Sequence, residues 1–275
     1  MPQWCTGNVV NQKLWSSGLF TITVATDEVE PFLPGQFLQL GVFPDGHDGD
    51  EDALINRPYS VASPHGKELE FFIVTVPDGE LTPRLEKLVA GTTVQVSKKA
   101  AGSFTLKKSP EKKHLWLVAT GTGLAPYVAM LRTKEPWQRY EKIVLVHGVR
   151  QASDLAYTKE LKDYETSKPS QFCLVQSLTR EDSDNTLRGR IPDLLKSGQL
   201  ESTASCQITA EDSAVYLCGN PAMLDSMEEA LGLRDMKKHR SKSPGNIVLE
   251  RYWYCLLYTS PSPRDRTRSR MPSSA

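Results

Sequence analysis

Hydrophobic and polar residues alternate with a period of two in several short runs within the first hundred residues. These runs cover residues 19–24, 36–42, 69–76 and 93–97, and turns rich in Gly, Pro and Asp separate them. Such alternation is typical of strands with one buried face, and short strands joined by turns favour an antiparallel barrel. The acidic, glycine-rich stretch over residues 44–52 contains nothing able to pack, so we expect a solvated loop there.

After residue 113 the pattern changes to continuous apolar runs that alternate with helical segments. The apolar runs cover residues 115–119, 143–147 and 214–218, and helical segments are expected over residues 124–132, 154–164, 191–197 and 222–231. Continuous apolar runs indicate strands that are buried on both faces. Strand and helix in alternation predict an α/β domain with a doubly wound parallel sheet. We therefore expect two domains, over residues 1–107 and 108–253.

Composition agrees with this division and narrows the functional classes. The 275 residues suffice for two domains of about 100 to 150 residues. The 33 Lys and Arg residues balance the 33 Asp and Glu residues, so the total charge indicates neither nucleic-acid binding nor a polybasic membrane anchor. The five cysteines are scattered and have no metal-ligand or disulfide-scaffold spacing. With no signal-like N-terminus and no apolar window of roughly 18 residues, the expectation is a soluble, cytoplasmic protein, monomeric by default.

Residues 57–60 read Arg-Pro-Tyr-Ser at the start of an apparent strand. In a strand Arg57 and Tyr59 share one face, so a guanidinium able to bind phosphate lies beside a ring able to stack on a flat cofactor. This combination suits a flavin with its pyrophosphate. An edge-strand tyrosine beside a surface arginine would give the same residues.

Two further segments place a glycine turn before the start of a helix. In residues 74–82 a strand leads to Gly79 and then to Thr82, and in residues 119–127 Gly121 and Gly123 lie between an apolar strand and a helix. Backbone amides at a helix start face an anion, and glycine lets the backbone approach a dinucleotide pyrophosphate. A plain capped helix and a tight turn of small residues are the structural alternatives.

These segments resemble a known motif series. Residues 57–60, 79–82, 121–126 and 218–221 are similar, in order, to the motifs of ferredoxin–NADP reductases. The resemblance covers residues 3–253 and is closest to the bacterial single-polypeptide branch. It implies an FAD-binding antiparallel β-barrel over residues 1–107 and an NADP-binding α/β domain over residues 108–253.

The resemblance implies FAD contacts at several positions of the barrel. Arg57 would bind the FAD phosphates, Tyr59 would lie against one face of the isoalloxazine, and Ser60 would lie near its reactive edge. Thr82 would cap the pyrophosphate. The other FAD positions implied before the end of the chain are Pro58, Phe72, Val74, Thr75 and Thr122.

The α/β domain is expected to bind NADP at the carboxyl ends of its strands, where ligands of open α/β sheets lie. The family uses arginines that follow strand ends for the 2′-phosphate region, here Arg150, Arg180 and Arg190. We therefore expect NADPH to be preferred to NADH by on the order of a hundred to ten-thousand-fold. Cys218 would lie beside the nicotinamide as a packing thiol, not a nucleophile, and His147 is interpreted as structural. The other NADP positions implied are Thr120, Gly121, Gly123, Gly219 and Asn220.

The family pattern ends in an aromatic pair, which here is Tyr252-Trp253. By the resemblance Tyr252 would cover the second flavin face and yield it to nicotinamide, and Trp253 would lie over the adenine of FAD. The chain continues to Ala275, and residues 255–265 are similar to a translated sequencing adapter. We expect residues 254–275 to be disordered and to have no function.

The implied activity is electron transfer between NADPH and a one-electron carrier, ferredoxin or flavodoxin. A flavin accepts a hydride and releases electrons singly, so no side-chain acid or base is required. The residues expected at the reacting rings, Tyr59, Ser60, Cys218 and Tyr252, therefore position these rings. Acidic carriers would dock on basic side chains, and the candidates are Lys107, Lys108, Lys112, Lys113, Lys237, Lys238, Arg240 and Lys242.

Two other functions share this pattern. One is a flavin reductase or the reductase component of an oxygenase, although the chain lacks the cysteine cluster of an iron–sulfur module. The other is a non-catalytic electron-transfer subunit that has lost its nucleotide. The intact residues Arg57 and Tyr59 and the turn over residues 121–123 argue against the second.

Overall fold

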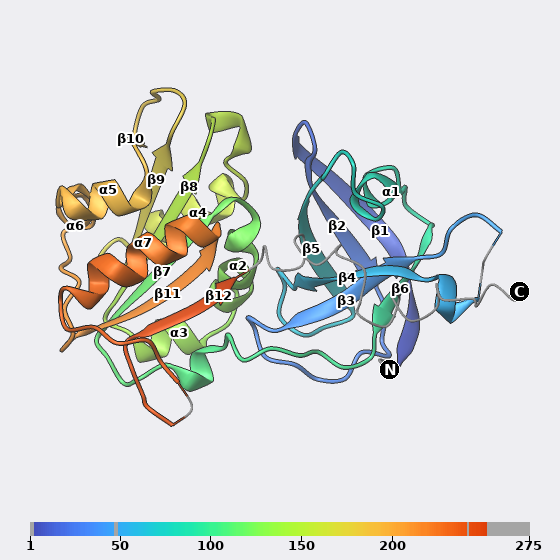
Figure 1. The fold of residues 1–275 in the computed structure, drawn as a ribbon, viewed down its shortest axis with the longest axis horizontal. Coiled ribbons are helices and arrows are strands. Elements are labelled where there is room, and N and C mark those ends of the chain that lie inside the picture. The colour runs from blue at the N-terminus through green and yellow to red at the C-terminus, as the bar shows by residue number, and fades with distance from the viewer. Residues whose placement is uncertain (1–2, 47–48, 241, 252–275) are drawn as a thin grey trace, which may run out of the picture.

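The computed structural model describes residues 3–46, 49–240 and 242–251, which form two six-stranded sheets (Figure 1). The first sheet is antiparallel, with the strand order β4-β3-β6-β1-β2-β5. Val61, directly after β4 at one edge, bridges to Phe71 of β5 at the other edge, so the sheet closes into a barrel. Its strands are β1 (Trp4–Ser16), β2 (Leu19–Ala25), β3 (Phe37–Val42), β4 (Ile55–Ser60), β5 (Glu68–Val74) and β6 (Thr93–Ser97).

Both faces of the barrel strands are used for packing. Phe20 and Ile22 of β2 fill the barrel interior, whereas Leu19 of the same strand joins the core shared with the second sheet. On β5, Phe71 points into the barrel and Phe72 points outward to the shared core. The period of two thus gives each strand one face for the barrel and one for its neighbour. The short helix α1 (Thr82–Glu86) adds Leu85 to the barrel core.

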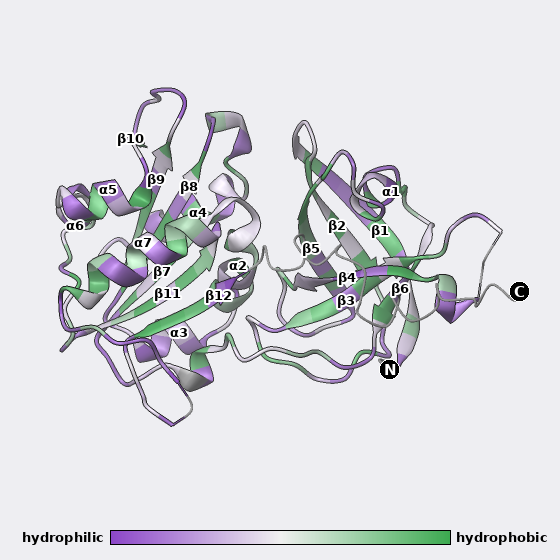
Figure 2. Cartoon of the chain, in the orientation of Figure 1, coloured by the Kyte–Doolittle hydropathy of each residue, from purple (hydrophilic) through white to green (hydrophobic). Residues whose placement is uncertain are grey.

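The second sheet is parallel, with the order β10-β9-β8-β7-β11-β12. Helices cover both of its faces, which makes it doubly wound, and Figure 2 shows hydrophobic strands beneath helices of mixed polarity. Its strands are β7 (His114–Thr120), β8 (Lys142–Val149), β9 (Phe172–Leu178), β10 (Leu187–Arg188), β11 (Ser213–Gly219) and β12 (Ile247–Arg251). The helices are α2 (Ala125–Leu131), α3 (Glu135–Arg139), α4 (Thr158–Ser167), α5 (Ile191–Lys196), α6 (Gln199–Ala204) and α7 (Pro221–Gly232). We call this part the α/β unit.

The predicted antiparallel barrel and doubly wound parallel sheet are therefore confirmed. One helix begins later than predicted, because the segment expected from residue 154 first forms a 3-10 turn, η4 (Ala152–Asp154), and α4 starts at Thr158. Between them Tyr157 has φ 56°, a left-handed conformation that no continuous helix contains. The predicted acidic loop contains a 3-10 turn, η1 (Glu51–Ala53), and its residues 47–48 lie outside the described part.

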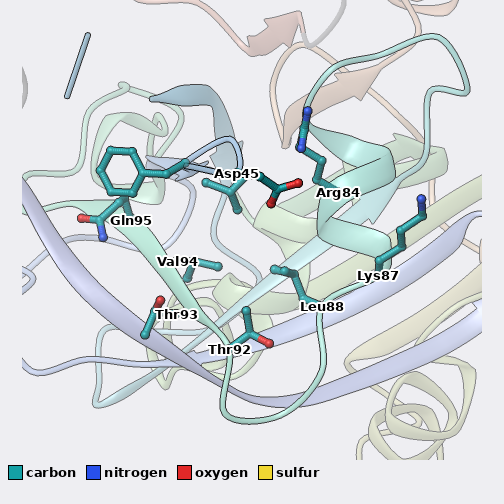
Figure 3. A pocket seen from close by; sticks show the side chains of 10 residues that line it. Asp45, Arg84, Lys87, Leu88, Thr92, Thr93, Val94 and Gln95 are labelled. Carbon is teal, nitrogen blue, oxygen red and sulfur yellow. The ribbon is translucent and has the colours of Figure 1, made fainter. Parts of the chain in front are cut away.

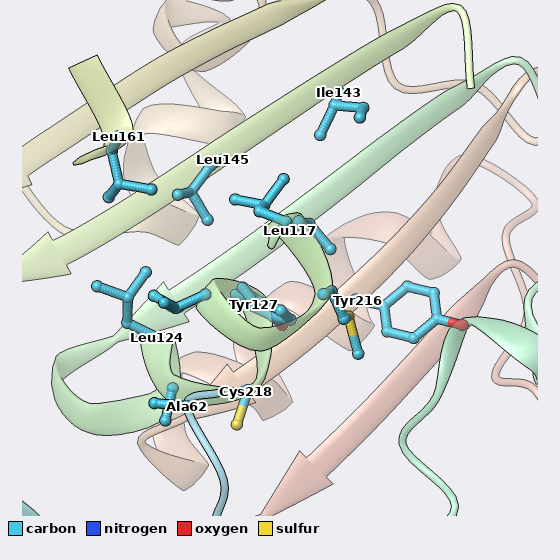
Figure 4. Packing of buried hydrophobic residues seen from close by; sticks show 14 of the residues in the cluster. Ala62, Leu117, Leu124, Tyr127, Ile143, Leu145, Leu161, Tyr216 and Cys218 are labelled. Atoms are coloured by element: carbon cyan, nitrogen blue, oxygen red, sulfur yellow. The ribbon is translucent and has the colours of Figure 1, made fainter. Parts of the chain in front are cut away.

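A shared core joins the barrel to the α/β unit. It contains Ala62, Phe72 and Phe104 together with residues of β7, β8, β11, α2 and α4. In Figure 4 Ala62 lies next to Cys218 at the end of β11. The segment between the sheets is held as well, since Tyr216 donates a hydrogen bond to the Thr105 carbonyl at 3.0 Å. The predicted domain boundary after residue 107 falls within a 3-10 turn of this segment, η2 (Leu106–Lys108).

Among the residues described, no helix combines the length and the apolar character that crossing a bilayer requires.

Candidate functional site

The Arg-Pro-Tyr-Ser segment lies within β4, an outer strand of the barrel sheet. Arg57 donates a hydrogen bond to the Asn56 carbonyl at 2.7 Å, and the carboxylate of Glu80 lies 4.0 Å away. The two side chains are 42% and 74% exposed, so this ion pair is weak and the guanidinium can bind another anion. Burial raises the pKa of Tyr59 above its ordinary value of 10, opposed only in part by Arg57, so the phenol is neutral.

Ser60 connects this strand to the last described strand of the α/β unit. Its hydroxyl donates a hydrogen bond to Oε2 of Glu250 on β12, with an oxygen–oxygen distance of 3.4 Å. Burial raises the pKa of the Glu250 carboxyl to about 7, while the bond from Ser60 lowers it by less. Glu250 pairs in register with Cys218 on β11, and Cys218 is fully buried. The structure thus gathers Ser60, Cys218 and Glu250 where the two sheets meet.

The sequence did not identify Glu250 as a site residue. The sequence feature that could have identified it is its position directly after the apolar residues 247–249 and two positions before the aromatic pair. A charged group at the end of a buried strand needs a partner. That partner, Ser60, is 190 positions away in the chain.

The glycine-rich turn after β7 forms a 3-10 helix, η3 (Gly121–Leu124), that leads into α2. Gly121 has φ +53°, and no atom lies within 4 Å of the position that its Cβ would take. Its carbonyl accepts a hydrogen bond from Nε2 of His147 at 3.2 Å. Burial lowers the pKa of His147 to about 4, so the ring is neutral and the bond from Nε2 selects one tautomer. Open space above a fixed backbone is what a bound pyrophosphate requires.

Gly123, the second glycine of this turn, allows a close contact between two backbone segments. A Cβ on Gly123 would lie 2.5 Å from the Cys218 carbonyl oxygen, so glycine here allows η3 to contact the end of β11. Gly219 has φ +132°, and its Cβ would lie 2.2 Å from Oγ1 of Thr120. That hydroxyl accepts the Asn220 N–H at 2.8 Å. The turns after β7 and β11, both predicted to bind NADP, are therefore joined to each other.

In the turn that contains Gly79, the side chain of Thr82 forms hydrogen bonds within the protein. Its hydroxyl accepts the Val76 N–H at 2.8 Å and lies 3.4 Å from the Val76 carbonyl, and the residue is 9% exposed. Thr75 likewise donates to Glu86 at 2.8 Å. The Thr82 hydroxyl thus closes the turn, and its contact with the pyrophosphate stays a prediction.

Phe72 and Val74 lie on the outward face of β5 but differ in exposure. Val74 is 39% exposed, so it can contact a cofactor. Phe72 is 3% exposed, and its ring packs edge-on against Tyr157 with centroids 5.4 Å apart. The predicted FAD contact of Phe72 therefore has no exposed ring surface.

The three predicted arginines all lie near the carboxyl edge of the parallel sheet. Arg150 and Arg180 follow β8 and β9, and the Arg180 N–H donates to the Arg150 carbonyl at 3.0 Å. Arg190 precedes the first turn of α5. All three are exposed, so their guanidinium groups are accessible to a ligand. Tyr252 and Trp253 lie outside the described residues.

A cavity of about 440 Å³ opens elsewhere on the barrel, between α1 and the ends of β3 and β6 (Figure 3). Asp45, Arg84 and Lys87 contribute its charged groups. None of the predicted cofactor residues lines it, so its size does not mark the predicted site. Within the described part of the chain, no cluster of His, Cys, Asp and Glu is arranged to hold a metal ion.

Comparison with known proteins decides the family. The chain is 40% identical over 255 residues to the flavodoxin/ferredoxin–NADP reductase of Escherichia coli, an alignment that spans 92% of this chain and all of the relative. The chain belongs to the flavodoxin/ferredoxin–NADP reductase family. A further member, the ferredoxin–NADP reductase of Pseudomonas aeruginosa, is 36% identical and aligns with 91% of this chain and 98% of its own length.

Two other comparisons agree with this family. Residues 117–229 match the oxidoreductase NAD-binding domain, which places that match on the α/β unit from β7 to α7. The crystal structure of a ferredoxin–NADP reductase from Neisseria gonorrhoeae with bound FAD and NADP superposes with a TM-score of 0.84. It is 28% identical and covers 91% of this chain and 99% of its own. The family fold thus includes both the barrel and the α/β unit.

Proposed function

We propose that this chain transfers electrons between NADPH and a small one-electron carrier, ferredoxin or flavodoxin, with FAD as its resident cofactor. One observation carries the proposal: β4, which contains Arg57 and Tyr59, is joined through Ser60 to Glu250 on β12 of the parallel sheet. Reductases with these carriers in their names are 36–40% identical to the chain over nearly its whole length. FAD supplies the conversion between two-electron and one-electron transfer.

The barrel provides the groups that fit FAD. Arg57 is partly exposed and only weakly paired with Glu80, so it can bind the phosphates; the neutral Tyr59 offers a ring for stacking, and Pro58 stiffens the strand between them. The backbone of the turn before Thr82 offers amide groups to the pyrophosphate. Val74, Thr75 and Thr122 stay predicted contacts, as do Tyr252 and Trp253, which lie outside the described residues.

The α/β unit provides the groups that fit NADP. Gly121 leaves open space above the turn that starts α2, and Arg150, Arg180 and Arg190 bring positive charge to the carboxyl edge of the sheet. Charge-assisted bonds to a 2′-phosphate would favour NADPH over NADH. We propose the division into an FAD domain over residues 1–107 and an NADP domain over residues 108–253 on the same grounds.

Ser60, Cys218 and Glu250 form the polar edge of the site at the junction. Ser60 orients the Glu250 carboxyl, and a pKa of about 7 lets that carboxyl hold or release a proton near neutral pH. Cys218 is fully buried and fills the space behind them. These residues position the reacting rings, and the proton on Glu250 can offset charge that forms there.

We further propose that the carrier docks transiently by charge on a monomer. Acidic carriers favour a basic surface, and the candidate residues are Lys107, Lys108, Lys112, Lys113, Lys237, Lys238, Arg240 and Lys242. Lys112 is partly engaged, since its ammonium donates to the carbonyls of Ala210 and Glu211 at 2.7 Å. Reversing several of the charges to Glu should weaken carrier reduction and its dependence on salt, and unchanged turnover would remove this idea.

The experiment that tests the function is reduction of the purified flavoprotein by NADPH and by NADH under anaerobic conditions. The chain should carry a flavin absorbance band, and NADPH should bleach it at far lower concentration than NADH. Ferredoxin or flavodoxin should then reoxidise the protein faster than free flavin does. Faster transfer to free flavin would favour a flavin reductase, and the absence of flavin would favour a non-catalytic subunit.

A further inference from the structure

Arg132 lies where the barrel meets the α/β unit, directly after the last residue of α2. Its Nε and Nη2 donate to the two carboxylate oxygens of Glu160 on α4, both at 2.8 Å. Its Nη1 donates across the junction to the Ala62 carbonyl at 3.1 Å and also to the carboxylate of Glu70 on β5. One guanidinium therefore binds both units, and its planar fork supplies the directions that these bonds need.

Glu70 is held from the other side by a chain of hydroxyl groups. Trp15 Nε1 donates to the hydroxyl of Thr21 at 2.8 Å, and that oxygen lies 3.1 Å from the hydroxyl of Tyr157. Tyr157 donates to Oε1 of Glu70 at 3.1 Å. An indole N–H only donates and a carboxylate only accepts, so each hydroxyl must donate toward Glu70. The barrel and the α/β unit are thus connected by a hydrogen-bond network whose donors converge on Glu70, with Arg132 on one side and Tyr157 on the other.

This network is enclosed and therefore stiff. Thr21 and Tyr157 are each 4% exposed, and the side chains of Glu70 and Arg132 are 21% and 22% exposed. Hydrogen bonds in an environment of low dielectric constant are stronger than in water and strengthen one another along a chain. The rings of Trp15 and Tyr157 lie 4.9 Å apart and add packing across the same junction.

Helix α2 relates Arg132 to the nucleotide turn. The helix begins after η3, which contains Gly121, and all seven of its residues are buried. At about 1.5 Å per residue the helix is a rod of roughly 10 Å. One end of α2 carries the glycine-rich turn, and Arg132 directly after its other end is bonded to Ala62 and Glu70 of the barrel, so the helix connects that turn to the barrel.

We propose that Arg132 is a positioning residue for hydride transfer: it fixes the angle at which the nucleotide turn faces the flavin-binding strand. The inference rests on the proposed function, because it assigns the reacting rings to the barrel and to the α/β unit. Replacing Arg132 leaves the carboxylates of Glu70 and Glu160 without their cation and lets the two units shift. A displacement of about 1 Å at the reacting atoms costs up to about a hundredfold in rate.

The test is single-turnover reduction of the FAD-bound protein over a series of NADPH concentrations, which separates the limiting rate from affinity. Arg132→Gln should lower the limiting rate by about 10- to 100-fold, and its NADPH dissociation constant should stay within about threefold of the wild-type value. Arg234→Gln is the matched control. Arg234 also binds a carboxylate with both ends of its fork, that of Glu201 at 2.8 and 3.0 Å, but wholly within the α/β unit. It should leave the limiting rate unchanged.

Amide hydrogen exchange of the FAD-bound protein gives a second reading that does not depend on activity. Arg132→Gln should raise exchange over residues 62–72 and 157–161, on both sides of the junction, whereas Arg234→Gln should raise it over residues 201–208. Arg132→Lys keeps the charge without the fork and should react at an intermediate rate. If Arg132→Gln does not fold, Glu70→Gln removes the carboxylate that Arg132 binds across the junction and should slow the reaction in the same direction.

Equal limiting rates in the wild type and Arg132→Gln, or equal losses in Arg132→Gln and Arg234→Gln, overturn the inference. Either result leaves the proposed function standing, since the wild type still reacts. A wild-type chain that binds no FAD or ignores NADPH overturns both.

Discussion

The pKa values of Glu250 and His147 are shifted in opposite directions, and the two shifts cover nearly the same range of pH. Burial raises the pKa of Glu250 from 4.5 to about 7 against the smaller effect of the Ser60 hydroxyl. Burial lowers the pKa of His147 from 6.5 to about 4 against the smaller effect of its bond to the Gly121 carbonyl. Each displacement corresponds to about 3 kcal/mol at about 1.4 kcal/mol per pH unit. The prediction is that the two effects nearly cancel in the wild type and that replacing either residue exposes the other.

The signs follow from which state holds more protons. Between pH 4.5 and about 7 the folded protein keeps a proton on Glu250 that the unfolded chain has released, so this group makes stability fall as pH rises. Between about pH 4 and pH 6.5 the unfolded chain holds a proton on His147 that the folded protein lacks, so this group makes stability rise with pH. Both effects end near neutral pH, above which neither group contributes a slope.

The assay is urea unfolding from about pH 4.5 to about pH 7.5 at one fixed concentration of free FAD. Relative to the wild type, the free energy of unfolding of Glu250→Gln should increase by about 3 kcal/mol across this range. That of His147→Gln should decrease across it by up to about the same amount. The pH-independent cost of each substitution shifts a whole curve and leaves its slope unchanged. Variant curves that run parallel to the wild-type curve would contradict the pKa shifts of Glu250 and His147.

Three further predictions concern the proposed cofactor contacts and the turns. Gly219→Ala should destabilise the protein by about 1–3 kcal/mol or more, because its φ is +132° and the new Cβ would lie 2.2 Å from Oγ1 of Thr120. The measurement is urea unfolding. The control is Gly232→Ala, which has open space around its Cβ and should leave the free energy of unfolding unchanged. Arg57→Gln should weaken FAD binding by roughly 10- to 100-fold, measured by flavin fluorescence titration, and unchanged affinity would contradict the phosphate contact. Arg180→Gln should lower the kcat/KM preference for NADPH over NADH by roughly tenfold or more, and an equal loss with both nucleotides would argue against a 2′-phosphate contact.

The elements that could be predicted were those whose hydrophobic pattern is uninterrupted. The apolar runs of β7, β8 and β11 are strands within one or two residues of the prediction. The 13-residue β1 was missed, although Cys5 and Val9 of this strand are buried. Its alternation is hidden because the inward position between them is Gly7, where a Cβ would lie 2.3 Å from Cγ1 of Val24. Glycine is required there because the two strands lie close together, and a hydropathy pattern carries no information on the distance between strands.

The candidate site divides in the same way. Motifs made of consecutive residues, such as Arg57 to Ser60, could be located from sequence because a strand places their side chains by itself. Glu250 and Arg132 could not, since their roles come from partners 190 and 62 positions away, respectively. Thr82 was located correctly as a helix start, but whether its hydroxyl binds a ligand or its own turn depends on the path of residues 76–82. The local sequence pattern therefore predicts which segment forms the site, and tertiary contacts decide which of its atoms can bind a ligand.

Tyr157 meets two demands that conflict with each other. Its left-handed φ of 56° costs roughly 1–3 kcal/mol for a side chain of this size. Glycine would remove that strain but also the ring packed against Trp15 and Phe72, and phenylalanine would keep the ring but lose the hydroxyl that donates to Glu70. Tyrosine is thus strained in its backbone but satisfies both the ring packing and the hydrogen bond around it. Relief of the backbone strain by glycine at this position would therefore remove the ring packing and the hydroxyl bond together.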